Sequence, residues 1–365
     1  MTQKYSQWKA LAAITKASFM AIFKQPASLF FSFLFPLVFI LIFGSFGKDT
    51  IPVNSIAFTP TSDTSNAFYD SMKTSPFIKI SRIADTALLR ENLELGRLTA
   101  ILHIIKLPSL PSTRYLVKVH TTTASEGKFP LLFQVLQMAS LQIASPNAEK
   151  RPFTLQPVVS EGRKYRQIDF VLPGQIGFSI LFATLFGISF TFFNMREQLI
   201  LKRFYATPVH KLVILFGIGT SRLFFQLINV ALLVLFGYFF LHFTLLHGWL
   251  TFLEIMVFSV VMLVFLMGVG LIISSVVKTD TTIPLLINLF GFPQMLLSGT
   301  FFSITVFPKW LQELCVFLPL TQFNNAMRKI SFDGLHLLDT WKEMGSLFIW
   351  TAITYFILSR LIKWE

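Results

Sequence analysis

Charged residues are scarce in this chain of 365 residues. Asp, Glu, Lys and Arg together make up 13% of it, whereas 53% of the residues are hydrophobic. A soluble globular domain carries about 25% charged residues, so the composition excludes an ordinary soluble protein. Cys315 is the only cysteine, which excludes an internal disulfide and a metal site built from cysteines. We interpret Cys315 as a packing residue.

Motifs for catalysis and nucleotide binding are also missing. The sequence has no Asp-rich pair to hold magnesium against a lipid diphosphate, no His-Glu-x-x-His zinc motif and no G-x-x-x-x-G-K-[ST] loop. Its 6 histidines are dispersed. We therefore expect no catalytic residue, no metal site and no cofactor bound by this chain, and a membrane enzyme is disfavoured.

Long uncharged runs are what the sequence does contain. Ala27–Phe46 and Phe170–Met195 hold no Asp, Glu, Lys or Arg, and about 20 apolar residues cross a hydrocarbon core of about 30 Å as a helix. A buried helix of a soluble protein is the weaker interpretation. Pro36 predicts a kink in the first run. We expect six spans, at residues 27–46, 170–195, 212–241, 251–277, 283–303 and 345–362.

The positions of the basic residues predict orientation. The net charge is +13, and the segment before the first span carries lysines but no acid. The loop after the second span is basic as well. Because short loops rich in Lys and Arg stay in the cytoplasm, we expect both termini to be cytoplasmic. The membrane that we expect is the inner membrane of a bacterium. The charge then reports topology, and we expect no nucleic-acid partner.

Two segments outside the spans have their own patterns. Residues 1–26 predict an amphipathic helix on the cytoplasmic membrane face, because lysines lie opposite an apolar side made of Trp8, Leu11, Phe19 and Ile22. Residues 47–169 alternate short β-like runs with helical patterns, which predicts a small α/β domain outside the cytoplasm. We expect the prolines of this region, Pro157 among them, at loops and element ends.

The segment Gln294–Arg328 interrupts the apolar pattern most sharply. It breaks at Ser298-Gly299, turns at Pro308, resumes as an amphipathic stretch and breaks again at Leu318-Pro319. A helix that stops at membrane depth is tolerated only where protein or a water-filled cavity covers its backbone. We therefore predict a re-entrant helical hairpin within residues 304–344, on a transport pathway. Its candidate gate residues are Ser298, Gly299, Phe301, Phe302, Pro308, Trp310, Pro319 and Arg328.

Together these features define the expected fold class. It is an α-helical polytopic membrane protein of six transmembrane helices, with a re-entrant hairpin before the last span and an inserted small α/β extracytoplasmic domain. Arg222 and Glu254 are the ionisable residues nearest to the span interiors, and we expect structural roles for both. Without a ladder of buried carboxylates, proton-coupled transport is disfavoured.

The cytoplasmic segment 196–211 reads REQLILKRFYATPVHK. Its apolar and basic residues fall near one face of a short helix that opens from the second span and ends at Thr207-Pro208. We interpret this helix as a docking peg for a partner protein. A basic loop that only sets orientation is the alternative.

These motifs resemble those of ABC type-2 permeases, the membrane subunits of ATP-binding-cassette exporters. The family pattern R-E-x-G-T-L-x-x-L-x-x-T-P-V stands here at Arg196–Val209, with Leu199-Ile200 in place of Gly-Thr. The pattern S-G-x-F-F-P-x-x-x-x-P-x-W-L-Q…L-P-L-T…A-x-R stands at Ser298–Arg328, with Ser303 in place of proline. A looser match from Asp63 to Pro108 is similar to the branch with a large external loop between spans one and two.

The resemblance implies a homodimer or heterodimer of permeases with two separate P-loop ATPase subunits, which hold ATP and Mg²⁺. It implies that the hairpin closes the outer end of a pathway for amphiphilic or lipid-like cargo: a drug, antibiotic, peptide or glycolipid. Membrane lipid and a periplasmic adaptor are further candidate partners. The implied ATPase-coupling residues are Arg196, Glu197, Lys202, Arg203, Phe204, Thr207 and Pro208.

A second function remains open at this point. A receptor or scaffold of the same membrane architecture, whose external domain binds a ligand, would share the spans and the basic loops. It would need no ATPase partner, so the two interpretations differ in what the segment 196–211 binds.

Overall fold

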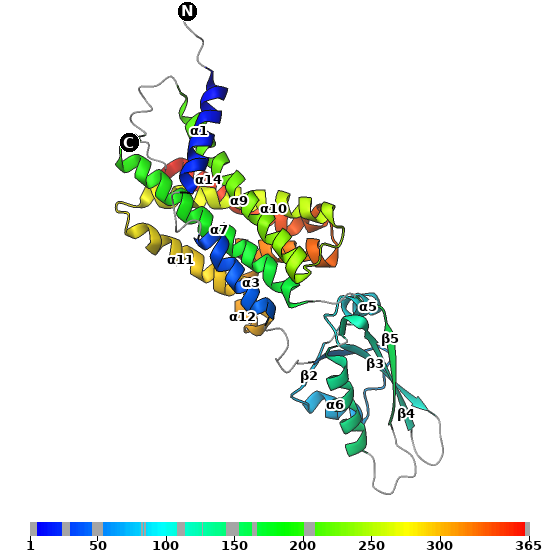
Figure 1. Ribbon diagram of the computed structural model, residues 1–365. Coiled ribbons are helices and arrows are strands. Elements are labelled where there is room, and N and C mark those ends of the chain that lie inside the picture. The colour runs from blue at the N-terminus through cyan, green and yellow to red at the C-terminus, as the bar shows by residue number, and fades with distance from the viewer. Residues whose placement is uncertain are drawn as a thin grey trace, which may run out of the picture. The chain divides into compact units, whose positions relative to one another are not determined.

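Figure 1 shows a computed structural model of the chain. The structure describes residues 6–23, 30–45, 54–81, 83, 85–107, 114–125, 127–143, 153–162, 166–200 and 209–361. The chain forms two compact units. Met1–Gly47 and Arg166–Glu365 make the helical unit, and Lys48–Tyr165 make the inserted unit.

Four helices in the described part of the chain are long and apolar enough to cross a membrane. They coincide with predicted spans two, three, four and six: α7 (Gln167–Glu197), α9 (Lys211–Leu241), α10 (Trp249–Val276) and α14 (Trp341–Leu361). The first and fifth predicted spans correspond to shorter apolar helices. These are α3 (Phe35–Ser45), which continues the π-helical turn η1 (Phe30–Leu34), and α11 (Thr282–Leu297). Six spans therefore remain a prediction.

The fifth predicted span is shorter than the sequence suggested. It was expected to run to residue 303, but α11 ends at Leu297. Gly299 follows with φ +72°, a left-handed conformation that cannot continue a helix. The apolar stretch beyond it leaves the helix axis, so hydrophobicity alone overestimates the length of this helix.

Helix α7 is the centre of the helical unit. It packs against α3, α9, α10, α11 and α13 (Pro319–Arg328), and nearly every side chain from Ile168 to Phe193 is buried. A helix that is apolar all round belongs in the interior. Its glycines allow neighbours to come close: a Cβ at Gly177 would lie 2.6 Å from Oδ1 of Asn324, and one at Gly187 would lie 2.7 Å from Nη1 of Arg222.

Helix α1 (Gln7–Ile22) packs along the first half of α9. A Cβ at Gly217 would touch Ile14, and the Phe19 ring lies 6.5 Å from that of Phe225. The predicted apolar side is divided in the structure, because Ile22 is buried whereas Trp8 is 80% exposed. Trp8 is therefore available to lipid or to a partner.

The segment between α11 and α14 contains several short helices. These are η3 (Ile304–Val306), α12 (Lys309–Phe317), α13, the π-helical turn η4 (Lys329–Asp333) and η5 (Leu337–Thr340). Helices α12 and α13 meet at Leu318, whose extended ψ of 132° breaks the helix before Pro319. Helix α13 is largely buried, whereas α12 exposes most of its side chains.

The inserted unit is an α/β fold, as the sequence predicted. Its sheet has the order β2-β1-β3-β4-β5, in which β3 and β4 are antiparallel and the other neighbouring pairs are parallel. Side chains of α4 and α6 pack on one face around Phe68 and Leu136, and α5 covers Ala57 and Ile101 on the other. The elements are β1 (Asn54–Phe58), α4 (Ala67–Thr74), β2 (Ile78–Ile80), α5 (Thr86–Glu94), β3 (Ala100–Leu107), β4 (Arg114–Thr122), η2 (Thr123–Ser125), α6 (Phe129–Gln142) and β5 (Phe153–Ser160).

The expectation that Pro157 marks a loop or an element end was wrong. Pro157 lies inside β5, opposite Val119 of β4. Proline has no N–H to donate, so a strand tolerates it at the edge of a sheet. Strand β5 pairs with β4 alone and forms that edge, which explains why a strand was missed here.

Candidate functional site

The break after α11 depends on backbone conformation. Ser298 is the C-cap of α11, and Gly299 takes φ +72°. A side chain at residue 299 would adopt this conformation only at a cost. The site has room for a Cβ, which would make ordinary van der Waals contacts with its nearest neighbours at 3.5 Å. Glycine is therefore required for its conformation rather than for its small size.

Asn324 of α13 donates hydrogen bonds to polar groups that have no partner in helix α11 because the helix ends there. Its Nδ2 donates to the carbonyl of Ser298 at 3.2 Å and to Oγ1 of Thr300 at 3.1 Å. From the other side, the N–H of Leu320 donates to Oε1 of Gln294 at 3.3 Å. Both amide side chains are buried. Buried side chains thus cover the backbone at the end of this interrupted helix.

Arg328 joins the break to the start of α7. Its guanidinium donates to the carbonyl of Gly299 at 2.5 Å and to that of Phe170 at 3.2 Å. It also lies 3.9 Å above the Phe170 ring. A planar guanidinium with several donors suits such a junction. Three segments distant in the sequence therefore meet at one side chain.

The predicted gate residues do not form one cluster. Ser298, Gly299 and Arg328 come together with Asn324, and Pro319 is buried as the first residue of α13. Phe301 faces α3, with its ring 5.3 Å from that of Phe39. The Phe302 ring lies near that of Phe307, Pro308 is the N-cap of α12, and Trp310 is 65% exposed.

Sequence reasoning missed Gln294, Thr300 and Asn324. Their signal was an amide or hydroxyl inside an apolar helical pattern, where a polar side chain is costly unless bonded. Which partner each would find could not be read from the sequence, because the partners lie 24 or 26 residues away.

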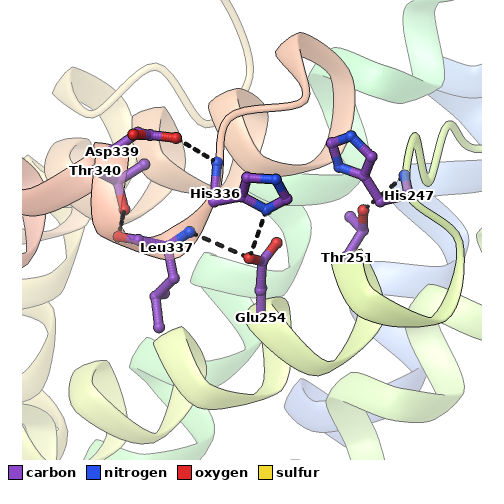
Figure 2. Close-up of polar contacts among 7 residues, drawn as sticks. All are labelled: His247, Thr251, Glu254, His336, Leu337, Asp339 and Thr340. Carbon is purple, nitrogen blue, oxygen red and sulfur yellow. Dashed lines mark hydrogen bonds and ion pairs between the residues drawn. The ribbon is translucent and has the colours of Figure 1, made fainter.

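Glu254 ties the start of α10 to the segment after the hairpin (Figure 2). Its Oε1 accepts a hydrogen bond from the N–H of Leu337 at 3.3 Å and lies 3.1 Å from Nδ1 of His336. The His336 ring stacks on His247, with centroids 4.8 Å apart. The expected structural role of Glu254 agrees with this position. Among the described residues, no group of three or more His, Cys, Asp or Glu side chains could hold a metal ion.

Buried polar groups join η1, α7 and α9. Because Pro36 has no N–H, it cannot bond to the carbonyl of Ser32 in an α-helix. That carbonyl instead accepts from Oγ of Ser179 at 2.9 Å. Ser179 in turn accepts from Nδ2 of Asn229 at 2.7 Å. Pro36 thus leaves the carbonyl of Ser32 available for a hydrogen bond from Ser179 of α7.

The series of polar groups continues along α9 because Arg222, Gln226 and Asn229 follow helical spacing. Arg222 donates to Oγ1 of Thr191 at 2.7 Å and is only 5% exposed, so it does not reach the surface. Within the described residues, neither amide atom of buried Gln175 has a hydrogen-bond partner. We call Gln175, Ser179, Thr191, Arg222, Gln226 and Asn229 the polar ladder.

Arg196, a predicted coupling residue, binds another helix end. Its guanidinium donates to the carbonyls of Ser274 at 3.0 Å and of Val277 at 2.5 Å. These carbonyls close α10, where a cation is favoured by the helix dipole. Glu197 is exposed at the last residue of α7. The other candidates, Lys202, Arg203, Phe204, Thr207 and Pro208, lie outside the described residues.

Leu199 stands where the permease pattern has glycine, and its φ is +56°. Its N–H donates to the carbonyl of Arg196, which closes α7 with a turn. The segment after α7 therefore begins with a conformation that glycine adopts without strain. The N–H of His210 donates to Oε1 of Gln7 at 3.2 Å, so the end of the loop lies beside the start of α1.

Comparison with known proteins agrees with this architecture. A family model described as "ABC-2 family transporter protein" matches residues 26–360. Similar curated proteins include "ABC transporter G family member 20" of Dictyostelium discoideum, 29% identical over 56% of this chain and 28% of that protein. Another is "Linearmycin resistance permease protein LnrN" of Bacillus subtilis, 27% identical over 49% of this chain and 46% of that protein.

A third similar protein is "Probable multidrug ABC transporter permease YbhR" of Escherichia coli, 32% identical over 24% of each chain. The matched segments span less than half the length of each of these relatives. The family model, by contrast, covers nearly the whole chain. With its apolar helices, this match shows that the chain belongs to the ABC-2 transporter family, as a multi-pass membrane permease.

Proposed function

We propose that this permease exports an amphiphilic or lipid-like substrate, driven by ATP hydrolysis on a separate ATPase subunit. The observation that carries the proposal is the bonded break at Ser298–Thr300, where Asn324 and Arg328 hold a helix that ends inside the apolar stretch. A simple span would not need such a break. We assign the break to the outer gate of the pathway.

The substrate class follows from the surroundings of the gate and from the relatives. Aromatic rings pack next to the break, with Phe39 against Phe301 and Phe302 near Phe307, and the buried polar ladder on α7 and α9 offers amides and hydroxyls. A substrate with an apolar body and a polar group matches both. Two relatives are named for linearmycin resistance and for multidrug transport, so we propose a drug, antibiotic, peptide or glycolipid as cargo.

The segment 196–211 is the proposed contact for the ATPase. It begins at exposed Glu197 and ends beside α1, so a partner here would touch two elements of the helical unit. ABC permeases pair with ATPase subunits, and we place that pairing at this segment. The proposed orientation has both termini in the cytoplasm of a bacterial cell and six spans in its inner membrane.

A second permease is the other proposed partner. Helix α11 exposes apolar side chains at helical spacing, which form one stripe: Leu285, Leu289, Phe292 and Leu296. The stripe lies on the helix that ends at the gate. A dimer that meets along it would place two gates side by side, whereas a monomer would leave the stripe to lipid.

Co-purification from gently solubilised membranes tests the proposal. We expect a P-loop ATPase in stoichiometric amount with the tagged permease, and we expect Arg203→Glu to release it. Arg360→Glu is the matched control, because Arg360 is an exposed basic residue in the last turn of α14. Recovery of the wild type without an ATPase would favour the receptor or scaffold interpretation instead.

A further inference from the structure

A groove of about 550 Å³ lies between α1 and α9, and its described walls come from these two helices alone. Trp8 and Leu11 of α1 line one side, and Phe224 and Ile228 of α9 line the other. The volume falls in the range of about 300–1,000 Å³ typical of small-molecule sites. The groove is therefore large enough for part of an organic ligand.

The two helices run in the same direction along the groove. A Cβ at Gly217 would touch Ile14, and further along both helices the Phe19 ring lies 6.5 Å from that of Phe225. Trp8 precedes these contacts on α1, so it lies at the end of the groove nearest the start of α9. The groove thus has a defined order along its length.

The walls become purely apolar toward the middle of α9. Phe224 and Ile228 follow Ser221 by three and seven residues, which places all three on one face of the helix. Phe224 is 55% exposed and Ile228 is 47% exposed. Ile228 lies about 10 Å further along α9 than Ser221 at 1.5 Å per residue. Because tryptophan favours the headgroup level of a membrane, the groove leads from headgroups at Trp8 into hydrocarbon at Ile228.

Ser221 brings a buried hydroxyl without a hydrogen bond to the wall of the groove. Its side chain is fully buried, and its Oγ has no hydrogen-bond partner within the described part of the chain. A serine inside a helix commonly bonds to the carbonyl four residues earlier, which Ser221 does not do. An unbonded buried hydroxyl is costly, so the site favours a ligand with an oxygen that accepts from it.

Lys16 supplies the only charge among the described lining residues. Its side chain is exposed, and it forms no ion pair with any residue that the structure describes. Helix α1 also carries Lys9 and has no Asp or Glu. An ammonium group on a flexible stem binds phosphate as a point charge. A fitting ligand therefore combines an anionic head, an acceptor oxygen and a hydrocarbon chain.

We propose that this groove binds an anionic phospholipid. The phosphate lies on Lys16, an ester carbonyl accepts from the hydroxyl of Ser221, and an acyl chain runs along Phe224 and Ile228. The bound lipid fills the space between α1 and α9 and stabilises their contact. This site is separate from the break after α11, and it does not depend on the identity of the cargo.

Lipid retention after purification tests the proposal. The full-length permease is reconstituted in phosphatidylcholine vesicles that contain phosphatidylglycerol as a minor component, then extracted in detergent, washed and analysed for bound lipid by mass spectrometry. We expect the wild type to retain phosphatidylglycerol in preference to phosphatidylcholine. Lys16→Gln should lower that retention about fivefold, because the charge that binds the phosphate is lost. Lys16→Arg keeps the charge and should keep the retention.

The matched control is Lys9→Gln, since Lys9 is an exposed lysine of the same helix and is not among the described lining residues. It should leave phosphatidylglycerol retention unchanged. Ala12→Phe fills the groove without changing its charge and should lower retention. Lys16 and Ala12 are both exposed, so neither change disturbs the core. Ser221→Ala tests the ester contact separately and should lower retention about threefold.

Four results would overturn the proposal. Equal retention of the two lipids by the wild type is one. Another is an equal loss in Lys9→Gln and Lys16→Gln, which would indicate attraction to the whole helix. Unchanged retention in Ala12→Phe would show that the lipid binds elsewhere, and displacement of phosphatidylglycerol by equimolar oleate would identify a free fatty acid as the occupant. The assay uses no ATPase and no transport, so its failure is distinguishable from failure of the export proposal.

Discussion

The guanidinium of Arg328 donates a hydrogen bond of 2.5 Å to the carbonyl of Gly299, across 29 residues of sequence. Gly299 directly follows Ser298, the C-cap of α11, and Arg328 is the last residue of α13, so one contact joins the two helix ends. The same side chain reaches the carbonyl of Phe170. The interrupted helix is therefore held in a single arrangement by side chains and does not depend on lipid for its hydrogen bonds.

Gly299→Ala should destabilise the helical unit by about 1–2 kcal/mol, because an L residue is strained at φ +72°. Steric crowding is a minor cause, since the Cβ position is open. Gly299→Asn should cost less, because Asn tolerates the left-handed region. Thermal unfolding of the purified proteins measures the expected order of stability, which is wild type, then Gly299→Asn, then Gly299→Ala. An alanine variant as stable as the wild type would contradict the role of this conformation.

Leu199→Gly should stabilise the end of α7 by about 1 kcal/mol. Leu199 is exposed and has φ +56°, so glycine removes strain at the C-terminal cap and little packing is lost. Hydrogen exchange of the amides of residues 194–199 measures the change. Leu199→Ala is the matched control, since it keeps the strain and removes the side chain. Equal protection in both variants would show that the strain is not relieved.

Gln175→Leu should raise stability and lower transport. The buried amide lacks a partner among the described residues, and an unsatisfied buried amide costs about 1–3 kcal/mol. A leucine of similar length removes that cost. If the polar ladder carries polar groups of the substrate, transport should fall although the protein melts at a higher temperature. Transport at the wild-type rate would exclude Gln175 from the pathway.

The inserted unit should lose stability on acidification through His120. Burial, then the nearby charges of His103, Lys118 and Arg90, lower the pKa of His120 below 6.5. The unfolded chain therefore binds more protons than the folded one below about pH 6.5, and stability falls as the pH drops from there toward the lower folded pKa. The hydrogen-exchange rates of the β4 amides, measured as a function of pH, report this loss of stability. His120→Gln should reduce the dependence of stability on pH. An unchanged pH dependence in this variant would contradict a role for His120.

The sequence allowed prediction of features that depend on local chemistry. Gly299, Pro308 and Pro319 end or begin helices in the structure, because glycine and proline act on their own backbone. The apolar runs of α7, α9 and α10 were recognisable since a spanning helix needs apolar residues along its whole length. The α/β fold of the inserted unit followed from the alternation of short β-like runs with helical patterns in residues 47–169.

Contacts between distant segments were beyond such reasoning. Asn324 looked like one polar residue among others until α13 packed on the end of α11. The coupling role of Arg196 stays a prediction, and the contact of its guanidinium with the end of α10 could not be read from the sequence. Strand β5 escaped because Pro157 argues against a strand unless the strand lies at an edge. In each case tertiary packing supplied the partner.

The hydrogen bonds from Arg196 to the last carbonyls of α10 link the ends of two helices. Arg196 is the second-last residue of α7, so the guanidinium fastens the tips of two membrane helices together. A pull on the segment that follows is shared by α7 and α10 rather than bending α7 alone. We expect a force applied at this end to tilt α7 and α10 as a pair. Helix α7 would carry that tilt to Phe170, whose carbonyl Arg328 binds beside the break that we propose as the gate.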